Sequence, residues 1–190
     1  MELILPIINN IGLLALAALV YTATPRTNDG INPLARALIL GLGLGCTSAA
    51  VMLVPIPFAP GVFYDSRGGP LLMSGILGGP VAAIVTAIPP ILMRASIGGI
   101  GMIPGIVGIL TASACSIVAW WILRHRKVDH VFLPLIAYAA TAALISLPAT
   151  LLIADKDLAW SLLAQFAPIV ILVNVASVTV LGLIISVETR

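Results

Sequence analysis

Charge is what this sequence has least of. Only 8% of its 190 residues are charged, and aromatic residues make up 5%. A soluble domain carries about a quarter charged residues, so this chain could not cover its own surface in water. The mean hydropathy is high, at +1.19. The composition therefore excludes an ordinary soluble domain and indicates an integral protein of the lipid bilayer.

Cysteines and catalytic signatures are scarce as well. Cys46 and Cys115 each lie inside an apolar segment without metal-site spacing, so we interpret them as buried thiols. The sequence holds no P-loop, GxSxG or HExxH motif, and we therefore expect no enzyme activity, no metal and no cofactor. The net charge of +2 is spread without a long basic run, which argues against nucleic-acid binding.

Long apolar runs dominate what is present. Crossing about 30 Å of hydrocarbon takes roughly 20 apolar residues in a helix. Six windows qualify, at residues 3–23, 38–55, 71–93, 100–123, 131–154 and 162–187. The connections between them are too short for a separate soluble domain. We predict an all-α membrane protein, a bundle of six transmembrane helices that forms one domain over residues 1–190.

The basic residues suggest an orientation for these spans. With six crossings, both termini share a side with the second and fourth loops. The fourth loop, "RHRKVDH" (124–130), is the most charged stretch of the chain. Because positive residues collect in cytoplasmic loops, we predict a multi-pass protein of the cytoplasmic (inner) membrane with both termini in the cytoplasm.

Glycine and proline interrupt the third and fourth spans. Pro89 and Pro90 predict a kink in the third span, and Pro104 lies in the fourth. Broken helices at membrane depth are tolerated mainly where they line protein or a wet cavity, so we expect a site in this region. Glycines spaced four apart indicate close helix packing. The pairs are Gly41 and Gly45, Gly75 and Gly79, and Gly101 and Gly105.

Two opposite charges stand out in "APGVFYDSRGGP" (59–70), at Asp65 and Arg67. In an extended segment, residues two apart share a face and can interact. Two interpretations remain open. The charges either face water and headgroups at a helix end, or they anchor a structural or ligand-binding loop. Whether residues 60–70 form a cytoplasmic loop or a re-entrant segment is equally open.

Arg94 is the next candidate, because the glycine-rich turn of Gly98, Gly99 and Gly101 follows it. The guanidinium either snorkels to the interface or, with backbone N–H groups of the turn, holds an anion. If the third span is a continuous helix, Asp65 and Arg94 lie about 34 Å apart on opposite membrane faces. Only a re-entrant segment would bring them together.

Asn32 and Arg36 lead into the second span. Arg36 is either an interfacial anchor or part of an outer pocket shared with Arg94. Asn174 lies within the sixth span, where asparagine most often bridges helices by hydrogen bonds.

Residues 60–110 resemble the LytS/YhcK-type 5TM receptor region (5TMR-LYT), the membrane sensor module of bacterial histidine kinases and diguanylate cyclases. An ordered set of motifs carries the resemblance: Pro-Gly, Asp-x-Arg, Gly-Gly-Pro, a single Arg and a Gly-Gly-x-Gly turn. These stand here at Pro60, Gly61, Asp65, Arg67, Gly78, Gly79, Pro80, Arg94, Gly98, Gly99, Gly101 and Gly105.

The resemblance implies a sensor that responds to a small ligand or an envelope cue and works as a homodimer. Its sixth helix would signal to a cytoplasmic output domain or partner protein, and no output domain is expected within this chain, which stops at "ISVETR" (185–190). We expect the Arg94 turn to recognise the cue and the Asp65 loop, if cytoplasmic, to couple to the output. A more distant similarity, to the S-components of energy-coupling-factor transporters, leaves a small-molecule-binding transporter subunit as the alternative.

Overall fold

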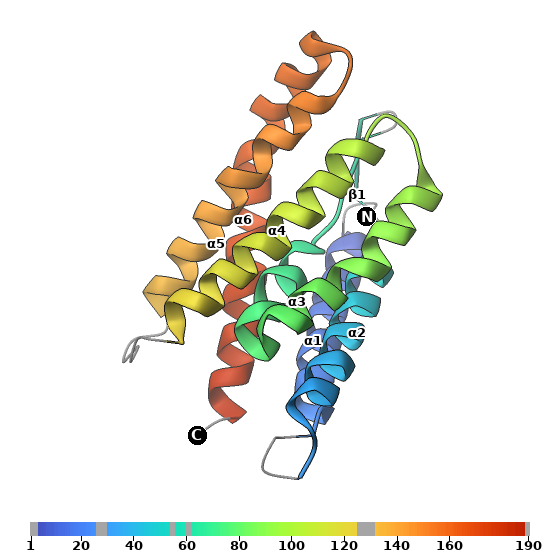
Figure 1. The fold of residues 1–190 in the computed structure, drawn as a ribbon. Coiled ribbons are helices and arrows are strands. Elements are labelled where there is room, and N and C mark those ends of the chain that lie inside the picture. The colour runs from blue at the N-terminus through green and yellow to red at the C-terminus, as the bar shows by residue number, and fades with distance from the viewer. Residues whose placement is uncertain (1–3, 26–29, 54–55, 60–61, 125–131, 189–190) are drawn as a thin grey trace.

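The structure is a computed structural model that describes residues 4–25, 30–53, 56–59, 62–124 and 132–188 (Figure 1). Each of the six apolar windows forms a helix, with boundaries shifted by up to several residues. The elements are α1 (Ile4–Ala23), α2 (Pro33–Val51), β1 (Ile56–Ala59), β2 (Val62–Tyr64), α3 (Gly68–Ile97), α4 (Met102–Leu123), α5 (Phe132–Ser146), the 3-10 helix η2 (Leu147–Leu152) and α6 (Lys156–Glu188).

Several helices are long and apolar enough to cross a bilayer. Four pass this test alone, at Pro33–Val51, Gly68–Ile97, Met102–Leu123 and Pro134–Leu152, and the bent pair within α6 makes a fifth. Large apolar side chains cover the outside of the bundle, such as Leu92 (65% exposed) and Leu172 (69% exposed). Such a surface is stable in lipid rather than in water. The prediction of a multi-pass helical membrane protein is confirmed.

The second window departs most from the prediction. We expected a span over 38–55, but α2 ends at Val51 and a short antiparallel hairpin follows, with Ile56 opposite Tyr64 and an irregularity between Pro57 and Ala59. The all-α prediction is therefore wrong for these few residues. The hairpin sets the chain direction just before Asp65.

α3 does not run straight across the bundle but folds back on itself at Gly79. This residue has φ 76° and ψ −173°, a backbone conformation that is essentially restricted to glycine. Pro80 then opens the second half, where its missing N–H costs nothing because first-turn donors have no helical partner. Pro89 and Pro90, where a kink is predicted, lie inside the helical second half, and the non-helical backbone falls at Gly79 instead.

Contacts with α2 show the reversal. Before the turn, Arg67 meets Ser48 through a hydrogen bond from the serine hydroxyl to the arginine carbonyl (3.4 Å), and Gly78 lies against Leu40. After the turn at Gly79, α3 runs in the opposite direction relative to α2.

The second half of α3 returns along the same face. Gly41 lies against Ala82, and Gly45 lies against Thr86 and Pro89. Residues 68–78 cover about 16 Å and residues 80–97 about 27 Å. α3 is thus a re-entrant hairpin whose two ends lie at the same end of the bundle.

This hairpin changes the topology. α1 runs antiparallel to α2, since Val20 lies against Gly43, and α6 ends beside the start of α5, since Gly182 lies against Leu135. Five stretches therefore run between the two ends of the bundle, namely α1, α2, α4, α5 with η2, and α6, and the termini lie at opposite ends (Figure 1). This path differs from the prediction of six crossings with both termini on one side, which took α3 for a straight span.

We name the two ends by their arginines. The Arg67 end holds the β-hairpin, the α3–α4 turn and η2, and the Arg36 end holds the start of α2, the reversal of α3 and the end of α4. Glycines let the helices between them approach closely, as predicted. A Cβ added at Gly41 would lie 2.8 Å from the Ala82 carbonyl oxygen, and one at Gly75 would lie 2.5 Å from the Ser116 carbonyl oxygen.

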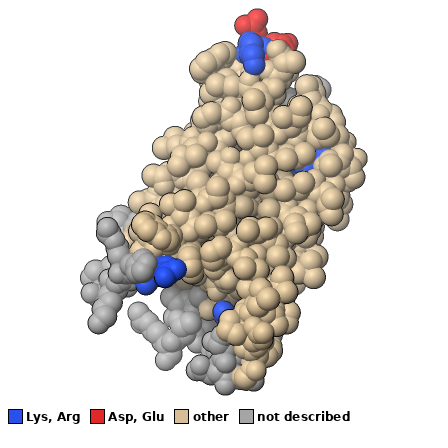
Figure 2. Space-filling view, viewed as in Figure 1, with Lys and Arg blue, Asp and Glu red and all other residues tan. Residues whose placement is uncertain are grey.

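Charge is distributed unequally between the two ends. Figure 2 shows a surface of mostly uncharged residues, with red and blue atoms at one tip and further blue atoms toward the opposite end. In the sequence, the segments that adjoin the helix ends at the Arg36 end contain six basic and three acidic residues (6 − 3 = +3), and those that adjoin the Arg67 end contain three basic and four acidic residues (3 − 4 = −1). The six basic residues are Arg26, Arg36, Arg124, Arg126, Lys127 and Arg190, of which the structure describes Arg36 and Arg124.

Candidate ligand-binding cavity

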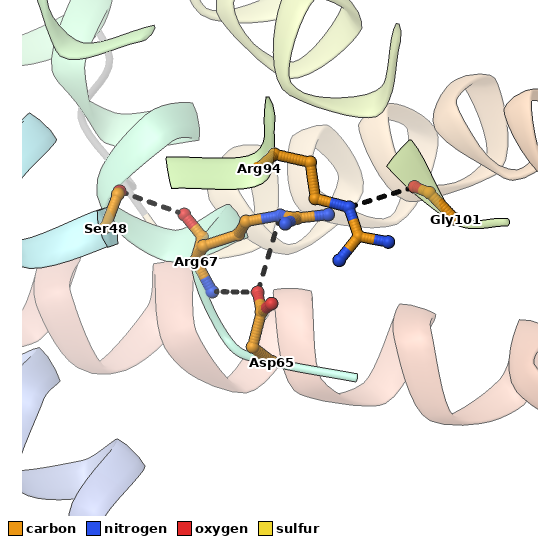
Figure 3. A network of polar contacts seen from close by, with 5 residues as sticks. All are labelled: Ser48, Asp65, Arg67, Arg94 and Gly101. Carbon is orange, nitrogen blue, oxygen red and sulfur yellow. Dashed lines mark hydrogen bonds and ion pairs between the residues drawn. The ribbon is translucent and has the colours of Figure 1, made fainter. Parts of the chain in front are cut away.

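The site begins at the connection between the β-hairpin and α3. Asp65 follows β2 directly, and its carboxylate accepts a hydrogen bond from the Arg67 backbone N–H (3.3 Å) and pairs with Arg67 Nε (3.4 Å) (Figure 3). The Asp65 side chain is 8% exposed and that of Arg67 21%. The two charges therefore form a largely buried ion pair, and they do not face water as loose loop charges.

Arg94 reaches the same place from the other end of α3. Its Nε donates a hydrogen bond to the Gly101 carbonyl (2.9 Å), and its side chain points toward Asp65 and Arg67 (Figure 3), close enough for their charges to act on it. Asp65 and Arg94 therefore do not lie on opposite faces, because the continuous helix on which that expectation depended is not what the structure shows. The condition named for bringing them together, a re-entrant third segment, is met.

The turn between α3 and α4 holds Gly101 in position. Gly98 and Gly99 have φ values of 67° and 79°, which side chains with a Cβ rarely adopt. The Gly98 N–H bonds the Arg94 carbonyl (3.1 Å), and the Met102 N–H bonds the Gly99 carbonyl (3.0 Å). These glycines shape the turn, and Gly101 is the one of the three that lines the cavity described next.

A cavity of about 210 Å³ lies between the two ends of α3, the start of α4, η2 and α6. Its polar lining comes mainly from the three charged side chains and Asn174, and its apolar lining from residues such as Leu71, Ile109 and Leu162. Asn174 is 8% exposed and lies against Gly68. A polar rim on an apolar body is the usual build of a small-molecule site.

The electrostatics of the cavity favour an anion. Two guanidinium groups and one carboxylate line it, which leaves one positive charge uncompensated among its described lining residues. Arg67 Nη1 is buried and has no hydrogen-bond partner in the part of the chain that the structure describes. An unpaired buried donor costs about 1–3 kcal/mol and more when it is charged. A ligand oxygen at this nitrogen would remove that cost.

The remaining predicted site residues lie at the far end. Asn32 caps α2, accepting a hydrogen bond from the Leu34 N–H at its side-chain oxygen (2.9 Å). Arg36 lines a separate groove with Gly79 and Trp120. The hypothesis of an outer pocket shared by Arg36 and Arg94 is therefore wrong, because α2 starts at the end of the bundle away from Arg94.

Sequence reasoning missed two parts of the lining. Asn174 was interpreted as a helix-bridging residue, although a buried amide in an apolar helix is also the signal of a cavity. η2 contributes Leu147 and Thr150. Pro148 in "LPATLL" is the sequence signal for a helix end here, but it does not show that the 3-10 segment lines a cavity.

Long apolar helices that run between the two ends of the bundle define a polytopic membrane domain, with a charged cavity near one of these ends. The sequence model described as "5TMR of 5TMR-LYT" matches residues 20–188. The chain belongs to this family, which is a transmembrane sensor region of signalling proteins and not a catalytic domain. The resemblance seen in the sequence is confirmed. No curated protein and no solved structure matches the chain.

Proposed function

We propose that this chain is a signal-input domain that binds a small anion in the cavity at the Arg67 end. The observation that carries the proposal is Arg67 Nη1, a buried cationic donor of a cavity-lining residue that has no hydrogen-bond partner among the residues described. Arg94 supplies a second guanidinium, and its Nε is occupied by Gly101. Arginine is well suited to carboxylates and phosphates, because its planar fork offers several donors to one anion.

The volume bounds the ligand. A cavity of about 210 Å³ has room for about seven water molecules at roughly 30 Å³ each, below the range of about 300–1,000 Å³ for drug-sized ligands. A carboxylate of a few carbons, or a phosphate, fits both the volume and the mixed lining. A larger, vitamin-sized ligand would extend beyond this volume.

The charge distribution supports an orientation. Positive residues collect on the cytoplasmic side of membrane proteins, and the sequence segments that adjoin the helix ends at the Arg36 end contain six of the nine basic residues. We therefore place this end in the cytoplasm, which differs from the predicted cytoplasmic N-terminus and retains the predicted cytoplasmic C-terminus. In an inner membrane the cavity then opens toward the outer face, where an envelope cue or external solute arrives.

α6 is the element that can carry the signal. Leu162, Val170 and Asn174 line the cavity, and the helix continues from there to the Arg36 end. The segments 156–165 and 167–183 meet at an angle of 48°, next to Pro168. A ligand that favours one bend angle over another shifts the population of α6 states. The output would be a histidine kinase or diguanylate cyclase domain, or a partner protein, in the cytoplasm, arranged as a homodimer.

Asp65 takes a different role from the one first expected. In this orientation it faces the outer cavity and not the cytoplasm. An anion at Arg67 competes with its carboxylate, so ligand binding and release of the ion pair are linked. The Asp65–Arg67 pair is thereby part of recognition.

Thermal unfolding of the purified chain with a panel of anions tests the proposal. Acetate, succinate, phosphate and sulfate are suitable probes, with sodium chloride as the ionic-strength control. We expect at least one of them to raise the Tm of the wild type, and Arg67→Gln and Arg94→Gln to abolish that shift. Arg36→Gln, which removes a cation remote from the cavity, should keep it. A panel without any specific shift would contradict the proposal.

The transporter-subunit alternative shares the feature of a cavity near the outer face. It predicts a vitamin-like ligand that co-purifies and uptake that depends on a partner ATPase. The cavity volume argues against it. Native mass spectrometry of the purified chain separates the two, since a retained ligand too large for about 210 Å³ would favour transport.

A further inference from the structure

A second cavity lies at the Arg36 end, far from the first. It is a shallow groove of about 460 Å³ between the start of α2, the reversal of α3 and Trp120 of α4. Apolar and glycine residues make up most of its lining. They are Pro33, Leu34, Ala37, Ile76, Leu77, Gly78, Gly79, Pro80 and Val81.

Arg36 is the one charged residue among the described residues of this lining. The residue is half-buried, and its Nε is buried without a hydrogen-bond partner among the described residues. No described carboxylate lines the groove to neutralise the charge. A buried cationic donor without a partner is costly in any protein, and more so beside lipid. The groove is therefore complementary to an anion.

The position of the groove is that of a membrane interface. Trp120 forms one wall, and the Arg124 guanidinium lies over its ring at 4.8 Å from the centroid. Indole rings favour the headgroup region. The positive balance of the Arg36 end would raise the local concentration of anionic headgroups there.

The groove is also open to the hydrocarbon. Leu34 is 53% exposed and Val81 38% exposed, and both belong to the lining. A free anion would leave these apolar walls uncovered. A molecule that carries a phosphate at one end and an acyl chain at the other matches the cation and the walls together.

We propose that this groove binds the phosphate of an anionic phospholipid, with Arg36 as its cationic ligand and an acyl chain along Leu34 and Val81. The lipid packs against Gly78, Gly79 and Pro80, where α3 reverses, and thereby supports the turn of the re-entrant hairpin. This site shares no lining residue with the anion cavity at the Arg67 end.

Native mass spectrometry of the full chain in detergent tests the proposal, with phosphatidylglycerol titrated against phosphatidylcholine of the same acyl chains. We expect phosphatidylglycerol to bind the wild type at least about tenfold more tightly, and Arg36→Gln to remove that preference. Arg36→Lys, which keeps the charge but not the fork, should retain part of it. Should Arg36→Gln fail to fold, the preference for phosphatidylglycerol is compared between Arg36→Lys and the wild type.

Two controls make the outcome decisive. Arg124→Gln removes a cation at the same end that does not line the groove, so it should keep most of the preference. Arg67→Gln should keep it fully even where anion binding at the first cavity is lost. Equal loss in Arg36→Gln and Arg124→Gln would overturn the site in favour of diffuse electrostatics. Competition by millimolar inorganic phosphate would overturn the lipid as the occupant.

Discussion

Gly105 and Gly108 offer a matched pair of substitutions on one face of α4. Both glycines line the anion cavity, but they differ in what an added methyl group meets. At Gly105 a Cβ would lie 2.7 Å from Arg94 Nε and 3.0 Å from its Cδ, closer than atoms tolerate. At Gly108 a Cβ would meet nothing within 4 Å.

The helix backbone at Gly105 is held by its own hydrogen bonds, so Arg94 has to move in Gly105→Ala. The 2.9 Å bond from Arg94 Nε to the Gly101 carbonyl is then lost, and the guanidinium leaves its position beside the cavity. The anion then loses a hydrogen bond from Arg94, and a hydrogen bond to a charged group contributes about 1.5–3 kcal/mol. That loss corresponds to a roughly 10- to 150-fold weaker affinity for the anion.

Isothermal titration calorimetry with the most stabilising anion of the panel measures this difference. Gly108→Ala is the reference, because both substitutions gain the same helix propensity, about 1 kcal/mol. We expect Gly105→Ala to bind about 10- to 150-fold more weakly than Gly108→Ala, and Gly108→Ala to stay within a few-fold of the wild type. Equal affinities in the two variants would refute the role of Arg94 in the site.

Three further predictions concern the hairpin and the two sites. Gly79→Ala should lower the Tm by roughly 2–12 °C, since the strain of about 1–3 kcal/mol converts at about 2–4 °C per kcal/mol; an unchanged Tm would speak against the reversal. Asp65→Asn should lower the Tm without ligand, because Arg67 and Arg94 then face each other without a carboxylate, and should enlarge the stabilisation by anions; a smaller stabilisation would contradict the competition between Asp65 and the ligand. Phosphatidylglycerol should change the anion affinity of the wild type but not of Arg36→Gln, because residues 68–78 join the two sites. By linkage, the anion should change the lipid affinity by the same factor. Calorimetry in nanodiscs with and without this lipid measures both affinities.

The sequence predicts the helices well because the bilayer fixes their length. About 20 apolar residues are needed for each crossing, and every window that met this condition forms a helix. The path of α3 depends instead on one backbone conformation, at Gly79. Pro89 and Pro90 were the more conspicuous breakers, yet the Pro89 ring packs against Gly45 of α2 within the helix.

The same reversal decided how much of the site was foreseen. Asp65, Arg67, Arg94 and Gly101 were all predicted as candidates, because a charge in an apolar chain needs a reason to persist. Their assembly into one cavity was not predicted, since a straight α3 would have separated Asp65 from Arg94 by about 34 Å. The sequence therefore identifies the candidate residues, but only the fold shows that they line the same cavity.

The sides on which the two termini lie test the fold-back of α3 most directly. Cysteines introduced at Glu2 and Arg190, with Cys46 and Cys115 replaced by serine, can be labelled in intact cells and in inverted vesicles with a membrane-impermeant maleimide. Five crossings predict that Glu2→Cys reacts only from outside and Arg190→Cys only from inside. Labelling of both positions from the same side would mean that α3 crosses the bilayer, and Arg67 and Arg94 could not then share one cavity.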